Sequence, residues 1–173
     1  MIPKDFLLKK HTDLTIHQLH TNRSIKKIIL HCSATAEGKD VTVATIRKWH
    51  LARKFNDIGY HYVIYRDGSI NIGRDINKIG AHTEGHNTGS IGICYIGGCA
   101  KDGRTPKDTR TPEQKIALYE LIDDLLMLYP TAEIHCHYEY ANKACPSFKL
   151  ETFKQEYKLW LETQKITPKC NLK

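Results

Sequence analysis

Several features that define common protein classes are missing from the 173-residue sequence. No apolar run approaches the roughly 20 residues that a membrane-spanning helix needs. The first ten residues have no apolar segment followed by small residues, so we expect synthesis in the cytoplasm without a signal peptide. Internal repeats and linkers rich in Gly, Ser or Pro are also missing. A chain of this length and pattern is expected to form one domain.

The cysteine pattern excludes the common structural zinc modules, because the six cysteines form no CxxC pair. In a protein without a signal peptide they are expected to be thiols or metal ligands rather than a disulfide framework. Lys and Arg number 26 against 19 Asp and Glu, a net charge of +7. This excess favours an anionic partner, such as nucleic acid, a membrane surface or a cell-wall polymer. With no nucleic-acid module recognisable, we expect no nucleic-acid partner.

The remaining pattern alternates predicted strands and helices, with one Asp-Gly hairpin signal at 67–68. It predicts the α/β class, as a single domain with a central mixed β-sheet flanked by helices. We expect an N-terminal extension over 1–23 with one edge strand near 14–19, the domain over 24–163 and a C-terminal tail over 164–173. Strands are predicted at 25–30, 60–65, 70–72, 91–96 and 132–135, and helices after Thr42, after Thr111 and from Leu150.

Three potential metal ligands lie at or just beyond predicted strands, where α/β sheets commonly place their ligands. His31 follows the strand 25–30, and His137 and Cys145 follow the strand 132–135. Two imidazoles and a thiolate would form a zinc site with a fourth position for water. The spacing of His137 and Cys145 fits no standard finger, so buried histidines and an inert cysteine are the alternative.

Nine short motifs, in this order, carry a resemblance to a known family. They are HCSAT at 31–35, WH at 49–50, GYHY at 59–62, RDG at 66–68, GRD at 73–75, AHTEGHN at 81–87, SIG at 90–92, GG at 97–98 and KACPSF at 143–148. Together they resemble the type 2 zinc-dependent N-acetylmuramoyl-L-alanine amidases, a group that includes phage lysozyme-type amidases and peptidoglycan recognition proteins. The resemblance covers about residues 25–160.

The resemblance implies one Zn²⁺ per chain, held by His31, His137 and Cys145. It also implies that Tyr60 and Lys143 are catalytic, with a lysine two residues before the cysteine matching the phage enzymes. The expected activity is zinc-dependent hydrolysis of the amide between N-acetylmuramic acid and L-alanine in peptidoglycan. Zinc would activate water, Lys143 would stabilise the oxyanion, and Tyr60 would orient the water or transfer a proton.

The resemblance also implies that His82 and Asn87 contact the muramyl-peptide, with a loop-stabilising role as the alternative. We interpret His61 as structural and Cys32 as a buried, inert thiol. The partner is expected to be peptidoglycan and the protein a monomer, acting on the cell wall after lysis or release through a holin-like or other route. The alternative functions are a non-catalytic peptidoglycan-binding module and a basic zinc protein that binds nucleic acid.

Overall fold

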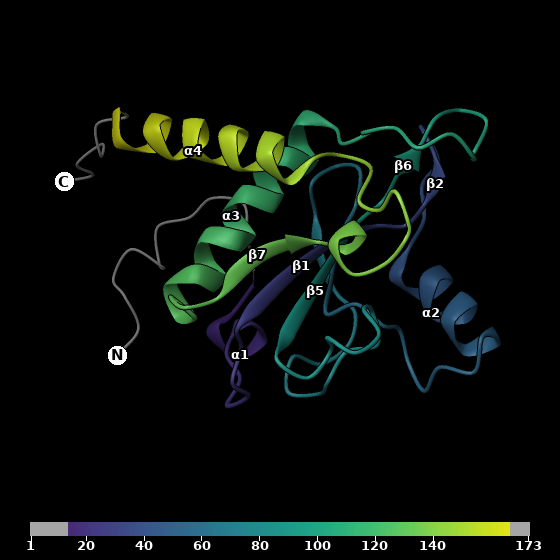
Figure 1. The fold of residues 1–173 in the computed structure, drawn as a ribbon, viewed down its shortest axis with the longest axis horizontal. Helices are drawn as coiled ribbons and strands as arrows, with labels where there is room; N and C mark the ends of the chain where they lie inside the picture. The colour runs from purple at the N-terminus through teal and green to yellow at the C-terminus, as the bar shows by residue number, and fades with distance from the viewer. Residues whose placement is uncertain (1–13, 167–173) are drawn as a thin grey trace.

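The computed structural model describes residues 14–166, which form a sheet with helices packed on both faces (Figure 1). The helices are α1 (Ile16–Leu19), α2 (Val43–Ala52), α3 (Pro112–Leu128) and α4 (Leu150–Ile166), with a short 3-10 helix, η2 (His137–Glu139). The strands are β1 (Lys27–Cys32), β2 (Thr35–Ala36), β3 (Tyr62–Ile64), β4 (Ile70–Ile72), β5 (Ser90–Tyr95), β6 (Gly98–Cys99) and β7 (Glu133–Cys136).

The main sheet has five strands in the order β4-β3-β5-β1-β7. Strand β1 pairs in parallel with both β5 and β7, and β3 pairs in parallel with β5. Only β4 is antiparallel, in the hairpin with β3 that the Asp-Gly signal predicts. Gly68 occupies the turn at φ +87°, a conformation that glycine adopts without strain. This mixed sheet confirms the predicted fold class.

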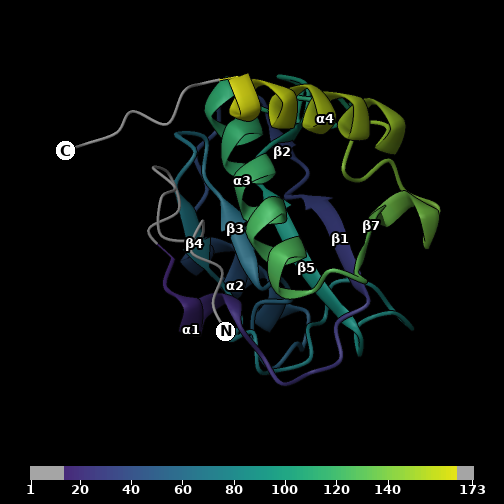
Figure 2. The same ribbon diagram turned by 90° about the vertical axis from the view of Figure 1, so that its left-hand side faces the viewer.

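One face of the sheet is apolar and is covered by α3 and α4 (Figure 2). Alternate residues of β1, such as Ile28 and Leu30, point into this core, as the period of two in a strand requires. Leu121 and Phe153, which are fully buried, come from the two helices. Helix α3 begins with Pro112 at its first position and with the predicted capping box between Thr111 and Gln114.

The opposite face carries a smaller apolar cluster. Ile46 of α2 packs with Val63 of β3 and Ile96. Helix α2 begins after Thr42, whose side chain accepts a hydrogen bond from the backbone N–H of Thr45, as the predicted cap requires. Helix α2 stands at one side of the sheet, on the side where β2 and β6 lie (Figure 1).

The predicted edge strand near residues 14–19 is wrong, because this segment forms the helix α1. The side-chain oxygen of Gln18 accepts a hydrogen bond from the backbone N–H of Thr15 at 2.8 Å, which favours a helical start. Leu19 is fully buried, and its carbonyl accepts a hydrogen bond from the Tyr129 hydroxyl. These contacts attach residues 14–19 firmly to the domain.

Residues 1–13 of the predicted extension and residues 167–173 of the predicted tail lie outside the described residues. The predicted domain boundaries therefore stay predictions. In the part of the chain from 14 to 166, every helix is too short or too polar to cross a membrane.

Candidate metal centre

Three separate segments bring His31, His137 and Cys145 together near the C-terminal end of β1. His31 is the fifth residue of β1, His137 opens η2 directly after β7, and Cys145 lies in the loop before α4. One potential ligand atom from each lies within 4.8 Å of the other two. In residues 14–166 no other His, Cys, Asp or Glu side chains form a comparable group of three. The structure thus brings together the three residues that the sequence predicts as ligands.

The spacing of these atoms suits a tetrahedral zinc ion. Zinc bonds of about 2.3 Å to sulfur and 2.0 Å to nitrogen would place the two ligand atoms about 3.6 Å apart. The distance from Cys145 Sγ to His31 Nδ1 is 3.9 Å, and the ring centroids of His31 and His137 are 4.5 Å apart. The donor set of two imidazoles and one thiol also fits zinc. The three ligand atoms all lie within 4.8 Å of one another, close to the separations that a tetrahedral zinc ion requires.

The backbone around Cys145 holds its sulfur beside β1. The backbone N–H of Cys32 donates a hydrogen bond to Cys145 Sγ at 3.2 Å, and the N–H of Tyr138 donates to the Cys145 carbonyl at 2.9 Å. The first contact joins the sulfur to the residue after His31, and the second joins the loop to η2. The loop therefore has a fixed position relative to both histidines.

Burial keeps the two histidines in the neutral form that binds a metal. It lowers the pKa of His31 well below its usual value, and the nearby His82, His137 and Lys143 lower it further. Burial, followed by the charge of Lys143, also lowers the pKa of His137. A hydrogen bond shared with the Cys32 thiol, followed by burial, raises the pKa of Cys145. A divalent cation would oppose that shift, because it favours the thiolate.

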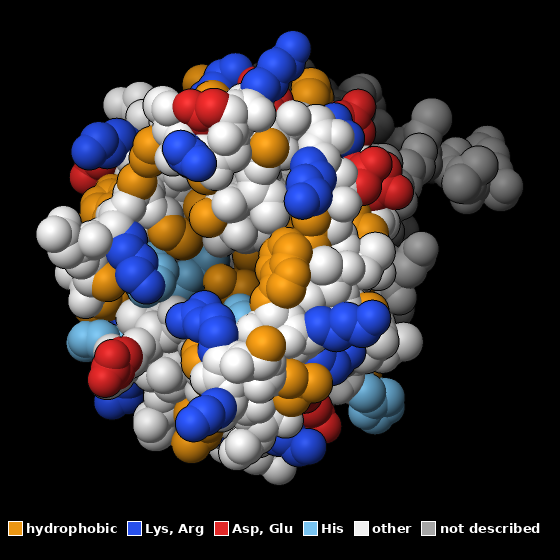
Figure 3. All heavy atoms as spheres, turned by 90° about the vertical axis from the view of Figure 1, so that its right-hand side faces the viewer, with side chains coloured by type: hydrophobic (Ala, Val, Ile, Leu, Met, Phe, Trp, Pro, Cys, Tyr) orange, Lys and Arg blue, Asp and Glu red, His pale blue; other side chains and the backbone are white. Residues whose placement is uncertain are grey.

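Tyr60 and Lys143 both lie beside this cluster. The ring centroids of Tyr60 and His31 are 5.1 Å apart. The pKa of the Tyr60 phenol is raised well above its usual value, mainly by burial. Lys143 is exposed two residues before Cys145, close enough for its charge to lower the pKa of His31 and His137. Figure 3 shows a hollow on this side of the molecule, with histidine side chains inside and Lys or Arg side chains around it.

His82 and Asn87, the predicted substrate contacts, make hydrogen bonds within the protein. His82 is 7% exposed, and its Nδ1 lies 3.1 Å from Nε2 of His31. The side-chain oxygen of Asn87 accepts hydrogen bonds from the backbone N–H groups of His82 and Thr83. These contacts support the loop-stabilising alternative, and contact of His82 or Asn87 with substrate stays a prediction.

Two other histidines are hydrogen-bonded to the backbone, and for His61 this agrees with the structural role that the sequence predicts. His61 is fully buried, and its Nδ1 accepts a hydrogen bond from the backbone N–H of Gly92. His50 is buried on α2, where its Nδ1 accepts a hydrogen bond from the backbone N–H of Gly59. The latter contact fixes the chain immediately before Tyr60. Both imidazoles are therefore bonded to the backbone, and neither belongs to the His31, His137 and Cys145 group.

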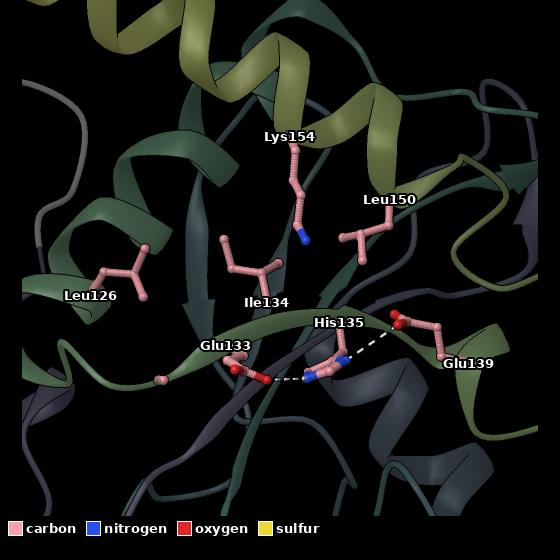
Figure 4. A pocket seen from close by; sticks show the side chains of 8 residues that line it. Leu126, Glu133, Ile134, His135, Glu139, Leu150 and Lys154 are labelled. Carbon is pink, nitrogen blue, oxygen red and sulfur yellow. Dashed lines mark hydrogen bonds and ion pairs between the residues drawn. The ribbon is translucent and has the colours of Figure 1, made fainter.

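A separate pocket lies beside the outer edge of β7, between α3 and α4 (Figure 4). Its lining includes the apolar side chains of Leu126, Ile134 and Leu150. His135 lies there with Nδ1 3.3 Å from Glu139 and Nε2 3.6 Å from Glu133. None of the three candidate ligands lines this pocket, so it is distinct from the metal centre.

Two side chains that contact the candidate ligands have no role predicted from the sequence. Cys32 is buried as predicted, but its thiol is hydrogen-bonded to that of Cys145. Thr83 places its hydroxyl 3.3 Å from Nε2 of His31. For Thr83, its place directly after His82 in the AHTEGHN motif is a signal in the sequence. For Cys32, nothing in the local sequence indicates contact with a residue 113 positions away.

An α/β domain with a His-His-Cys group above its sheet defines a class of candidate metalloproteins, and comparison with known proteins identifies the family. Residues 21–148 match the family model for N-acetylmuramoyl-L-alanine amidase. The endolysin of Enterobacteria phage K11 is 40% identical over 134 residues, covering 78% of this chain and 88% of the relative. A peptidoglycan-recognition protein of Drosophila melanogaster is 28% identical over 79% of this chain and 76% of its own length.

Among solved structures, the N-acetylmuramoyl-L-alanine amidase LysC from Clostridium intestinale aligns with a TM-score of 0.67 and 27% identity. The alignment covers 79% of this chain and 87% of the LysC chain. The chain belongs to the N-acetylmuramoyl-L-alanine amidase family. The family and the enzyme class predicted from the motifs are confirmed.

Proposed function

We propose that this protein is a zinc-dependent endolysin that cleaves the amide between N-acetylmuramic acid and L-alanine in peptidoglycan. The main support for the proposal is that potential ligand atoms of His31, His137 and Cys145 lie within 4.8 Å of one another near the C-terminal end of β1. Family membership supports the amidase chemistry, and the similarity to a phage endolysin supports a role in cell-wall lysis. The net charge of +7 favours association with anionic wall polymers.

In this proposal the two imidazoles and the thiolate hold one zinc ion. When bound, zinc supplies Lewis-acid activation of water and of the amide carbonyl. The low pKa values of His31 and His137 keep both rings neutral and able to bind. The remaining steps are assigned to side chains that do not hold the metal.

Tyr60 is proposed to position the attacking water or to transfer its proton. Its raised pKa keeps the phenol protonated at neutral pH, so that its hydroxyl can donate as well as accept a hydrogen bond. Lys143 is proposed to stabilise the negative charge that develops on the carbonyl oxygen. An exposed ammonium beside the ligand loop can reach a substrate from the solvent side of the site.

The similarity to a peptidoglycan-recognition protein supports one alternative, a module that binds peptidoglycan without cleaving it. The two functions separate in one experiment, in which purified peptidoglycan is incubated with metal-loaded protein and the soluble products are analysed by mass spectrometry. An amidase releases stem peptides with a free L-alanine amino group and leaves the lactyl carboxylate on the glycan. Binding to peptidoglycan without release of these peptides would contradict the proposed activity and favour the alternative.

A further inference from the structure

The two ring nitrogens of His31 face different surroundings. Nδ1 lies on the side of the cluster, 3.9 Å from Cys145 Sγ. Nε2 lies on the other side, 3.1 Å from Nδ1 of His82 and 3.3 Å from the Thr83 hydroxyl. If His31 binds a metal through the nitrogen that faces Cys145, the proton of its neutral ring must be on Nε2. That N–H then requires an acceptor.

Nδ1 of His82 is the nearer acceptor, since the Thr83 hydroxyl lies 3.3 Å from Nε2 of His31 and also 3.1 Å from Nδ1 of His82. A chain of hydrogen bonds determines the tautomer of His82. Nε2 of His82 lies 3.3 Å from the Ser90 hydroxyl, which donates a hydrogen bond to the Asn87 carbonyl at 3.2 Å. A carbonyl can only accept, so Ser90 must be the donor in the last link. The Ser90 oxygen is then free to accept from an N–H at Nε2 of His82, which leaves Nδ1 of His82 unprotonated and able to accept from His31.

The protein is shaped closely around the His82 ring. A Cβ atom added to Gly92 would lie 2.5 Å from Cγ and Cδ2 of His82, so glycine is needed where the ring crosses β5. The backbone N–H of His82 is bonded to Asn87, and Arg23 donates a hydrogen bond to the Ser90 carbonyl. These contacts fix both the His82 ring and Ser90, the residue that accepts the hydrogen bond from its Nε2.

We propose that His82 is a positioning residue, which accepts the Nε2 proton of His31 and thereby directs the Nδ1 lone pair of His31 toward His137 and Cys145. This inference rests on the proposed metal binding. It assigns His82 a role through His31 in place of direct contact with substrate. Partners of this kind, behind a metal-binding imidazole, commonly change metal affinity by about 10–100-fold when removed.

The test compares zinc affinity in three variants, measured by competition with a chromophoric chelator. His82→Phe removes the acceptor and should weaken zinc binding by about 10–100-fold. His82→Asn places an amide oxygen near the position of Nδ1 and should restore part of the affinity. His61→Phe is the matched control, because it removes an equally buried imidazole that has no hydrogen bond to His31. It should lose stability and keep its zinc affinity.

Proton-detected ¹⁵N spectra of the zinc-loaded wild-type protein test the same inference without any substitution. The spectra should show His31 with zinc on Nδ1 and a proton on Nε2. Zinc bound through Nε2 would overturn the inference, as would equal zinc affinity in His82→Phe and wild type. Loss of affinity in His61→Phe to the same extent as in His82→Phe would also overturn it, since both losses would then be structural.

The positioning role of His82 and the proposed amidase activity can be contradicted separately. Wild-type protein that binds zinc on Nδ1 of His31 but releases no stem peptide from peptidoglycan would contradict the amidase proposal and leave the role of His82 supported. Wild-type protein that takes up no zinc would contradict both. Cleavage of peptidoglycan by wild type and His82→Asn, with equal zinc affinity in all variants, would contradict the positioning role alone.

Discussion

The two faces of the central sheet use the same strands for different purposes. On one face, Ile28 and Leu30 of β1 pack under α3 and α4 in an apolar core. On the other, His31 of the same strand meets His137 and Cys145. Because side chains alternate along a strand, one short segment supplies residues to both the core and the candidate metal centre. Substitutions on the core face should therefore reduce stability, whereas substitutions at the site should reduce activity in a protein that still folds.

The largest effect is expected from removal of the thiol ligand. Cys145→Ser should lose bound zinc and with it all measurable amidase activity, because serine does not provide the soft thiolate that completes the ligand set. Native mass spectrometry would measure the bound metal. Cys32→Ala is the matched control, a neighbouring buried thiol that should keep its zinc. Equal retention of zinc by both variants would remove Cys145 from the ligand set.

Tyr60→Phe should leave zinc content and folding unchanged while lowering the rate. It removes only the hydroxyl, and the ring beside His31 stays in place. If that hydroxyl positions water or transfers a proton, the rate should fall by about 10²–10⁴-fold. Steady-state kinetics should show the loss mainly in kcat. A variant with the kcat of wild type would reduce Tyr60 to part of the wall of the groove.

Lys143→Ala should lower the rate by about 10²–10³-fold, because it removes a charge that is proposed to stabilise the oxyanion. Zinc content should again be unchanged. Lys149→Ala, which removes an exposed lysine from the other end of the same loop, serves as the control for a general loss of positive charge. Similar kinetics for the two variants would show that Lys143 acts through the overall charge rather than at the site.

On the core face, Leu121→Ala should lower the free energy of unfolding by about 2–5 kcal/mol. Leu121 is fully buried on α3, so the substitution leaves a cavity in the core. Urea denaturation measures the loss, and kcat should stay near that of wild type under conditions where the variant is folded. A large fall in kcat with little change in stability would break the division between the two faces.

The smallest effect concerns the dependence of stability on pH. Burial is the main cause that lowers the pKa of His61 to about 4, with Arg23 and Arg74 lowering it further. The unfolded chain binds this proton near pH 6.5, the usual pKa of histidine, and the folded protein binds it only near pH 4, so stability should fall as the pH drops between these values. The loss from this group should reach at most about 3 kcal/mol.

His61→Gln should flatten this part of the stability profile, because glutamine does not titrate. The free energy of unfolding from urea denaturation, measured at about pH 7, 5.5 and 4.5 for wild type and variant, tests the assignment. Parallel profiles for the two proteins would show that other groups cause the slope.

Much of the fold could be predicted because its signals are local. The Asp-Gly hairpin, the cap at Thr42, and the capping box after Thr111 all depend on residues within a few positions of one another. The strands β2 and β6 could not be predicted, since two residues each are too few to show a period. Helix α1 was missed because the sequence around Ile16 favours strand, whereas the Thr15–Gln18 contact and burial of Leu19 favour the helix.

The candidate metal centre could be predicted only in part. Strand ends and motif order indicated His31, His137 and Cys145, and the structure brings them together. The hydrogen bond between His31 and His82 joins residues 51 positions apart and depends on how a loop crosses β5. Contacts of this kind follow from tertiary packing, and no local pattern in the sequence reveals them.

The zinc content of the wild-type protein tests the proposed zinc-dependent amidase most directly. Elemental analysis of protein purified without added metal should find close to one zinc per chain, as expected for two imidazoles and a thiolate at the observed spacing. The same preparation should cleave peptidoglycan, lose that activity to a chelator and regain it when zinc is restored. Protein that contains no zinc, and that neither binds zinc nor gains activity when it is added, would contradict the central claim.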